Sequence, residues 1–147
     1  MRVPLALLVV LLLARSVAAD PPELVVIVNV DNPVKMTPEY LEGLFLKKER
    51  FWEGSAPVIA LNAPPDNPSR REFDRVVLGM SGETAASYWI DARIRSGSAP
   101  PKEVADPALV VKLVVKLKGA IAYVPATTSV AGVRVVGRIK RGKWMTP

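Results

Sequence analysis

The order of apolar runs along the chain predicts strands that alternate with helices. Residues Glu23–Val30 are almost continuously apolar, which is typical of a strand covered on both faces. Three later runs are short, rich in β-branched residues and bounded by proline or glycine, and they predict further strands at residues 57–61, 120–124 and 133–139. The segments between these runs have helical spacing instead.

Four helix starts are predicted by capping residues that precede an apolar stripe. Thr37 and Asp106 are each followed by proline, which suits the first position of a helix. Ser81 precedes a third helical pattern, and Ser69 has Glu72 three residues later, which is the pattern of a capping box. Gly79 and Gly119 are placed to end two of these helices. Strands that alternate with helices predict an α/β domain with a mostly parallel sheet flanked by helices.

The segment Pro57–Leu78 combines a predicted strand, a proline-rich polar turn and a predicted helix. A strand that turns directly into a helix presents free backbone N–H groups at the helix start, where an anion can bind. The turn Asn62–Arg71 is therefore the first candidate for a functional site. Two neighbouring arginines, Arg70 and Arg71, follow the turn, and arginine suits bidentate contacts with oxyanions.

Ligands of parallel α/β sheets gather outside the carboxyl ends of the strands. Three polar loops are predicted to leave that edge, at residues 29–32, 62–69 and 125–129. Their hydroxyl and amide groups would suit a small polar solute or an oxyanion. The alternative is that Asn, Pro, Ser and Thr occur there because they form turns.

The amino terminus has the pattern of a secretory signal. Arg2 precedes an apolar run of about twelve residues, and small residues at Val17 and Ala19 fit a cleavage site before Asp20. We therefore expect a signal peptide at residues 1–19 and a periplasmic mature protein. An uncleaved amino-terminal anchor is the alternative, because Arg15 directly follows the hydrophobic core.

Composition narrows the chemistry of the mature chain. Residues 20–147 contain 18 basic and 14 acidic residues, a net charge of +4, which favours anionic partners. The sequence has no histidine and no cysteine, which excludes a Ser–His triad, the usual zinc sites and disulfides. The length suits one domain, predicted at residues 20–140, followed by a basic tail at residues 141–147.

Several motifs resemble, in order, those of phosphate-binding proteins, the solute receptors of phosphate ABC transporters. Residues Tyr40–Gly54 are similar to a helix followed by Ile-Phe-x-Gly-Lys and x-x-Trp-x-Asp-Gly. Tyr88 and Trp89 match an aromatic pair, and Gly119–Val124 is similar to the element Pro-Gly-Ala-Ile-Gly-Tyr. The resemblance runs from about Leu24 to Val124 and implies one lobe of a type 2 periplasmic binding protein.

In that family, the strand–turn–helix junction carries Arg-x-x-Gly-Ser-Gly-Thr, and these residues grip phosphate. Ser69 aligns with the threonine, Asn67 and Pro68 replace Ser and Gly, and Ala63 occupies the arginine position. The resemblance and the edge loops together give this set of predicted ligand-binding residues: Asn29, Asn67, Ser69, Arg70, Arg71 and Thr127.

The function expected from the sequence is an exported, non-catalytic domain that binds or senses a small oxyanion such as phosphate. No catalytic residue, metal site or cofactor is predicted. The expected partners are the anion, an envelope or transporter protein, and a second copy of the chain that would complete an open cleft; nucleic acid is not expected. The alternative is a ligand-free module with the same fold that binds another envelope protein.

Overall fold

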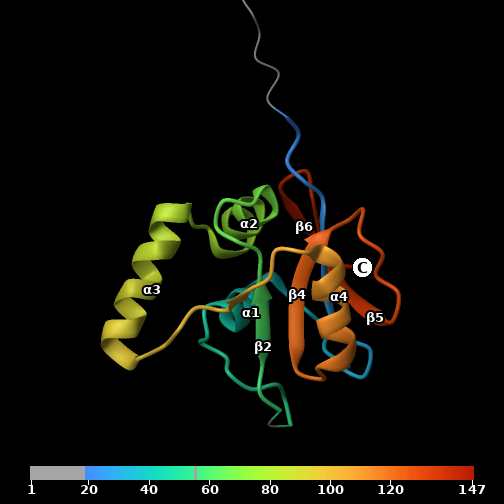
Figure 1. Cartoon of the computed structure of the whole chain (residues 1–147), viewed down its shortest axis with the longest axis horizontal. Helices are drawn as coiled ribbons and strands as arrows, with labels where there is room; N and C mark the ends of the chain where they lie inside the picture. The colour runs from blue at the N-terminus through green and yellow to red at the C-terminus, as the bar shows by residue number, and fades with distance from the viewer. Residues whose placement is uncertain (1–18, 55) are drawn as a thin grey trace, which may run out of the picture.

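A six-stranded sheet with helices on both faces forms the body of the protein. The computed structural model describes residues 19–54 and 56–147, so the predicted signal lies outside the described residues except for Ala19. The elements are β1 (Leu24–Asn29), α1 (Pro38–Phe45), β2 (Ile59–Asn62), α2 (Pro68–Phe73), the π-helical turn η1 (Asp74–Leu78), α3 (Gly82–Ser96), β3 (Lys102–Glu103), α4 (Pro107–Lys116), β4 (Ala120–Pro125), β5 (Val133–Lys140) and β6 (Lys143–Met145). The predicted α/β class and the flanking helices are confirmed (Figure 1).

The sheet is mixed rather than mostly parallel. Its strand order is β3-β2-β4-β1-β5-β6. Strand β2 runs parallel to β3 and β4, whereas β1 is antiparallel to β4 and β5, and β5 is antiparallel to β6. The prediction of a mostly parallel sheet is therefore wrong. Hydrophobic runs identify strands but carry no information on strand direction.

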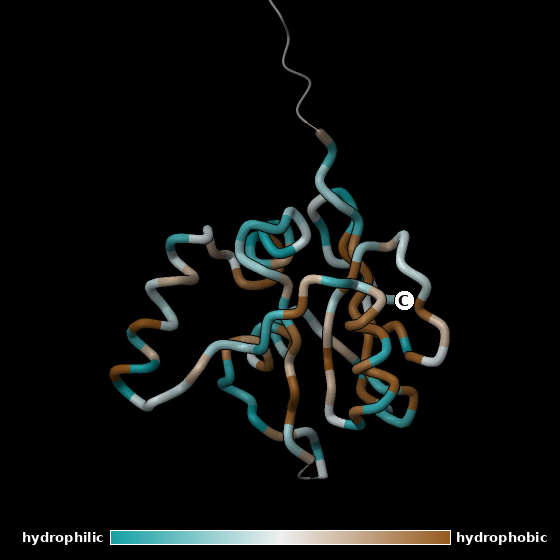
Figure 2. The backbone as a smooth tube through the Cα atoms, in the orientation of Figure 1, coloured by the Kyte–Doolittle hydropathy of each residue, from teal (hydrophilic) through white to brown (hydrophobic). Residues whose placement is uncertain are grey.

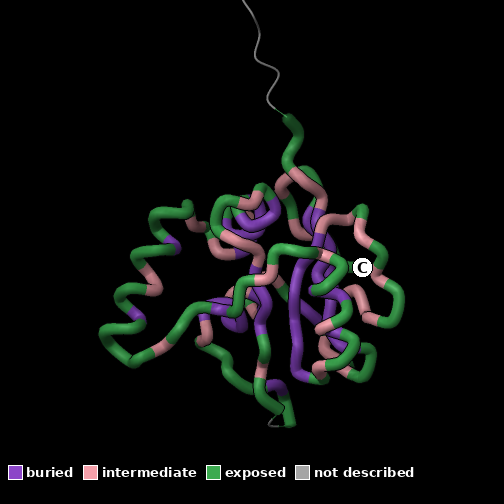
Figure 3. Tube along the Cα trace, in the orientation of Figure 1, coloured by how far each residue is buried: buried purple, intermediate pink, exposed green. Residues whose placement is uncertain are grey.

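The core lies on both faces of β1. All six residues of β1 are buried, as its continuous apolar run predicts. On one face Val26 packs with Phe45 of α1 and Phe73 of α2, and on the other Ile27 packs with Val114 of α4. Hydrophobic segments therefore concentrate on the strands and α4 (Figure 2), and the central strands are the most continuously buried parts of the trace (Figure 3).

The helix starts follow the predicted capping residues in three of four cases. The side chains of Thr37, Ser81 and Asp106 accept hydrogen bonds from backbone N–H groups of α1, α3 and α4. Helix α3 lies at the side of the sheet, beyond β2 and α2 (Figure 1). None of the helices in the described part of the chain has the length and apolar character needed to cross a bilayer.

The carboxyl-terminal segment, predicted as a basic tail, contributes a strand to the sheet. Lys143–Met145 form β6, which pairs with β5. Trp144 lies directly over Gly137 of β5, where a Cβ atom would come within 2.0 Å of the indole ring. The side chain of Trp144 thereby packs against the core as a partly buried residue.

Candidate functional site

The parallel pairing of β2 and β4 brings two of the three predicted loops to one edge of the sheet. Both strands end there, so the turn before α2 and the loop after β4 lie close together. Asn67 and Ser69 lie on the first segment, and Thr127 lies exposed on the second. We call this region the α2–β4 edge.

Asn29 lies at the opposite edge, because β1 is antiparallel to β4. The register pairs Leu24 with Pro125, so the carboxyl end of β1 lies beside the start of β4. The amide group of Asn29 donates to the carbonyl oxygens of Val114 and Val115, at 2.9 and 3.0 Å. Asn29 therefore links β1 to the end of α4, and the structure does not bring it to the other predicted site residues.

Helix α2 begins two residues earlier than the capping-box pattern predicts, because its N-cap is Asn67 and not Ser69. Asn67 is the N-cap, its Oδ1 accepts from the Ser69 N–H at 2.8 Å, and Pro68 takes the first helical position. The predicted capping box of Ser69 and Glu72 is wrong. Glu72 instead pairs with Arg75 at 2.9 Å, so its carboxylate does not occupy the donors at the helix start.

A pocket of about 60 Å³ opens at the α2–β4 edge. Its polar lining comes from Asn67 and Ser69 at the start of α2 and from Tyr123 of β4. The remaining lining is apolar or backbone, from Ala63, Val104, Ala105, Pro107, Val110, Val124 and Pro125. The pocket is therefore lined by neutral groups, and Ser69 is held there with only 7% of its surface exposed.

Arg70 and Arg71 are both committed to contacts within the chain. Arg70 is buried, and its guanidinium donates to Asp74 Oδ2 at 2.8 Å and to the Ala63 carbonyl at 2.9 Å. Arg71 is exposed and donates to the Asp66 carbonyl at 2.7 Å. Both arginines therefore brace the turn between β2 and α2, and neither lines the pocket.

Two buried polar groups near the pocket, on Tyr123 and Asp74, are not among the residues predicted from the sequence. The Tyr123 hydroxyl donates to Asn62 Oδ1 and accepts from the Ala63 N–H at 3.1 Å, and burial raises the pKa of Tyr123. Burial also raises the pKa of Asp74, although Arg70 opposes that shift. The signal for Tyr123 is a hydroxyl group within an otherwise apolar strand, and the signal for Asp74 is its spacing of four from Arg70.

The described part of the chain holds no cluster of His, Cys, Asp and Glu side chains that could hold a metal ion. The neutral lining of the α2–β4 edge offers hydrogen bonds and shape to a ligand. Its chemistry is that of a neutral hydrogen-bonding pocket above a buried ion pair.

Comparison with solved structures places this fold among phosphate receptors. An ABC-type phosphate transport receptor from Vibrio cholerae superposes with a TM-score of 0.62 at 17% identity, over 80% of this chain. The chain has a phosphate-receptor-like fold. A protein assigned as a phosphate ABC transporter substrate-binding protein from Clostridium perfringens, with bound phosphate, gives the same values. PstS from Borrelia burgdorferi matches 71% of the chain with a TM-score of 0.55 at 14% identity.

The chain spans about half the length of the receptors that it matches. It covers 46% of the Clostridium protein, 47% of the Vibrio protein and 42% of the Borrelia protein. No protein-family model and no curated protein matches the sequence. At these identities the likeness shows the fold, and it confirms the predicted resemblance at that level.

Proposed function

We propose that the protein is an exported, non-catalytic module of the periplasm that binds a small oxyanion such as phosphate at the α2–β4 edge. The observation that supports this is the convergence of Asn67, Ser69 and Tyr123 on one pocket in a phosphate-receptor-like fold. Thr127 on the facing loop has a further, exposed hydroxyl group at this edge. Asn29 takes no part, because it lies at the opposite end of β1.

The affinity of this edge for phosphate should be low. No charged side chain lines the pocket, and the guanidinium of Arg70 is held by Asp74 and Ala63. Hydrogen bonds between neutral donors and an anion are weaker than those from a guanidinium, which are charge-assisted on both sides. We expect a dissociation constant on the order of 1 mM, which corresponds to about 4 kcal/mol of binding free energy.

Isothermal titration of the mature chain, residues 20–147, with inorganic phosphate tests this proposal. We expect saturable binding in the millimolar range, weakened at least fivefold by Ser69→Ala because the variant removes a hydroxyl from the pocket. Ser87→Ala is the matched control, since Ser87 lies exposed on α3. The absence of binding at tens of millimolar phosphate, or equal affinities for the two variants, would refute the assignment of the site.

A ligand-free interaction module on the same fold is the second candidate, and the buried Arg70–Asp74 pair favours it. An arginine that is fixed by a carboxylate cannot neutralise an incoming anion without breaking that pair. Restoring the family's turn through Ala63→Arg, Asp66→Gly, Asn67→Ser, Pro68→Gly and Ser69→Thr separates the two candidates. The restored turn should create affinity for phosphate if the natural edge has none, and it should only strengthen a measurable affinity if the natural edge binds.

A further inference from the structure

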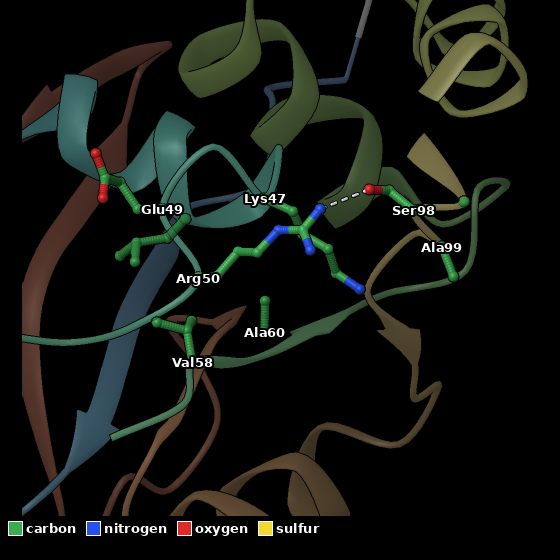
Figure 4. Close-up of a pocket in the computed structure, with 9 residues that line it drawn as sticks. Lys47, Glu49, Arg50, Val58, Ala60, Ser98 and Ala99 are labelled. Carbon is green, nitrogen blue, oxygen red and sulfur yellow. Dashed lines mark hydrogen bonds between the residues drawn. The ribbon is translucent and has the colours of Figure 1, made fainter. Parts of the chain in front are cut away.

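A second and larger pocket lies between the segment that follows α1 and the segment that follows α3. Its volume is about 300 Å³, which is in the range of small-molecule sites. It is lined by Leu44, Lys47, Glu49, Arg50, Val58, Ala60, Gly97, Ser98 and Ala99 (Figure 4). No residue is shared with the pocket at the α2–β4 edge.

Two cationic side chains and a hydroxyl group line this pocket. The guanidinium of Arg50 donates to Ser98 Oγ at 2.8 Å, which fixes its orientation (Figure 4). This bond uses one of the five N–H donors of an arginine. Within residues 19–54 and 56–147, neither Lys47 nor Arg50 forms an ion pair within 4.0 Å. The one acidic lining residue, Glu49, directs its carboxylate away from both cations (Figure 4).

The positive charges of Lys47 and Arg50 are mutually unfavourable. Burial lowers the pKa of Lys47, and the positive charge of Arg50 lowers it further. An anion placed between the two side chains would remove this repulsion and stabilise the charged form of the lysine.

The backbone at Lys47 also adopts a conformation that disfavours a lysine. Its φ of 56° lies in the left-handed region, at the position after a helix where glycine is most common. A lysine in this conformation destabilises the folded state relative to glycine by about 1 kcal/mol. The ammonium group of Lys47 is available to contact a ligand in this pocket.

We propose that this pocket binds a small phosphate monoester, with Lys47, Arg50 and Ser98 contacting the phosphoryl oxygens. Arginine presents a planar fork that matches phosphate, and lysine adds a point charge. Leu44, Val58 and Ala60 provide an apolar surface for the organic part of the ligand. The site is separate from the α2–β4 edge and does not depend on oxyanion binding there.

Phenyl phosphate titrated into the ¹⁵N-labelled mature chain, followed by amide chemical shifts, tests the proposal. We expect saturable shifts at Lys48, Gly97 and Ser98, which flank the pocket. Arg50→Gln and Lys47→Gln should each weaken the apparent affinity about tenfold or more. Lys48→Gln is the matched control, because this neighbouring lysine is exposed and lies 3.6 Å from Glu42, with which it pairs.

The ligands in this titration distinguish the two sites and the two kinds of contact. Phenyl phosphate should bind at this pocket more tightly than inorganic phosphate, because only the ester contacts the apolar surface. Phenol, which lacks the anion, should produce no saturable shift there. Shifts confined to Asn67 and Ser69 would overturn this inference and leave the proposed function intact. Equal affinities for Arg50→Gln, Lys48→Gln and the natural chain would overturn the inference as well. Ser98→Ala provides a further variant that leaves both cations in place.

Discussion

A buried ion pair lies beneath the turn that joins β2 to α2. The side chains of Arg70 and Asp74 are 9% and 4% exposed, and Nε lies 2.8 Å from Oδ2. The other carboxylate oxygen of Asp74 is buried and has no hydrogen-bond partner among the described residues. Removing either partner of a buried ion pair leaves an uncompensated charge, at a cost of about 3–5 kcal/mol. The pair therefore supports the shape of the turn and cannot easily be opened for a ligand.

The raised pKa of Asp74 predicts a specific dependence of stability on pH. Burial is the main cause, and Arg70 opposes it. Because the folded protein binds this proton more tightly than the unfolded chain does, the stabilisation is fully present below the ordinary pKa of 3.8 and is lost as the pH rises through the folded-state pKa. The variant Asp74→Asn lacks this term, so its stability relative to the natural chain should rise with pH across that window.

Urea unfolding of both proteins at closely spaced pH values from 3.5 to 7 measures this difference. Asp91→Asn removes a carboxylate that is 60% exposed, and it controls for the general loss of one negative charge. A difference between the natural chain and Asp74→Asn that stays constant over the whole range would contradict the prediction.

The hydroxyl of Tyr123 bridges two segments at the edge of the pocket. It donates to Asn62 and accepts from the backbone of Ala63, while its ring stacks on Phe73 at 4.1 Å. Tyr123→Phe keeps the stacking but leaves a buried donor and acceptor unpaired, so we expect a loss of about 1–3 kcal/mol in the free energy of unfolding. In the control Tyr88→Phe, the lost bond to Leu46 is only partly buried, and the loss should be smaller. Equal losses in urea unfolding would argue against the bridge.

At the scale of residues, the sequence located the candidate edge but not the direction of its side chains. Asn67 and Ser69 line the pocket at this edge, since their positions follow from the strand–turn–helix order. The inward direction of Arg70 depends on the helical phase, which in turn depends on whether Asn67 or Ser69 is the N-cap. Both residues are good N-caps, and Pro68, which suits the first position of a helix, favours Asn67.

At the end of α1, Lys47 is expected to lower the stability of the fold and to contribute to the proposed binding of a phosphate monoester. The helix ends at Phe45, and Lys47 adopts a left-handed conformation with φ of 56°. Lys47→Gly should raise the free energy of unfolding by up to about 1 kcal/mol, because glycine adopts this conformation without a steric cost and the gain is reduced by its greater freedom when unfolded. The same variant should lose affinity for phenyl phosphate.

Chemical unfolding together with the amide-shift titration measures both effects in one protein. Lys48→Gly is the control, because its backbone has no positive φ and glycine there should not stabilise the fold. A variant at Lys47 that is destabilised, or that keeps its affinity, would contradict the prediction.

Elements with strong local signals were predicted, and those set by tertiary pairing were not. Strand β1 and the N-caps of α1, α3 and α4 follow from local pattern. The antiparallel direction of β1 against β4 does not, and it alone moved Asn29 to the opposite edge. The two-residue strand β3 and the three-residue strand β6 are too short to give an alternating pattern, so they exist only through their partners.

At the scale of the whole chain, the described residues span about half the length of the receptors that they resemble. In the isolated chain the α2–β4 edge faces solvent, and neutral groups line its pocket. With a dissociation constant near 1 mM, phosphate at about 10 mM stabilises the folded state by RT ln(11), or about 1.4 kcal/mol. For a domain of this size that corresponds to a rise in melting temperature of about 5 °C.

Thermal unfolding of residues 20–147 in phosphate, with chloride at matched ionic strength as the reference, measures this rise. Ser69→Ala should reduce it and Ser87→Ala should not. A dissociation constant near 10 μM would instead stabilise the folded state by about 4 kcal/mol at the same phosphate concentration. The melting temperature would then rise by about 15 °C. So large a shift would require further donors, and a second copy of the chain is the available source; the shift would then increase with protein concentration. A rise that is modest and independent of protein concentration fits one open lobe, and the absence of any rise would contradict oxyanion binding at this edge.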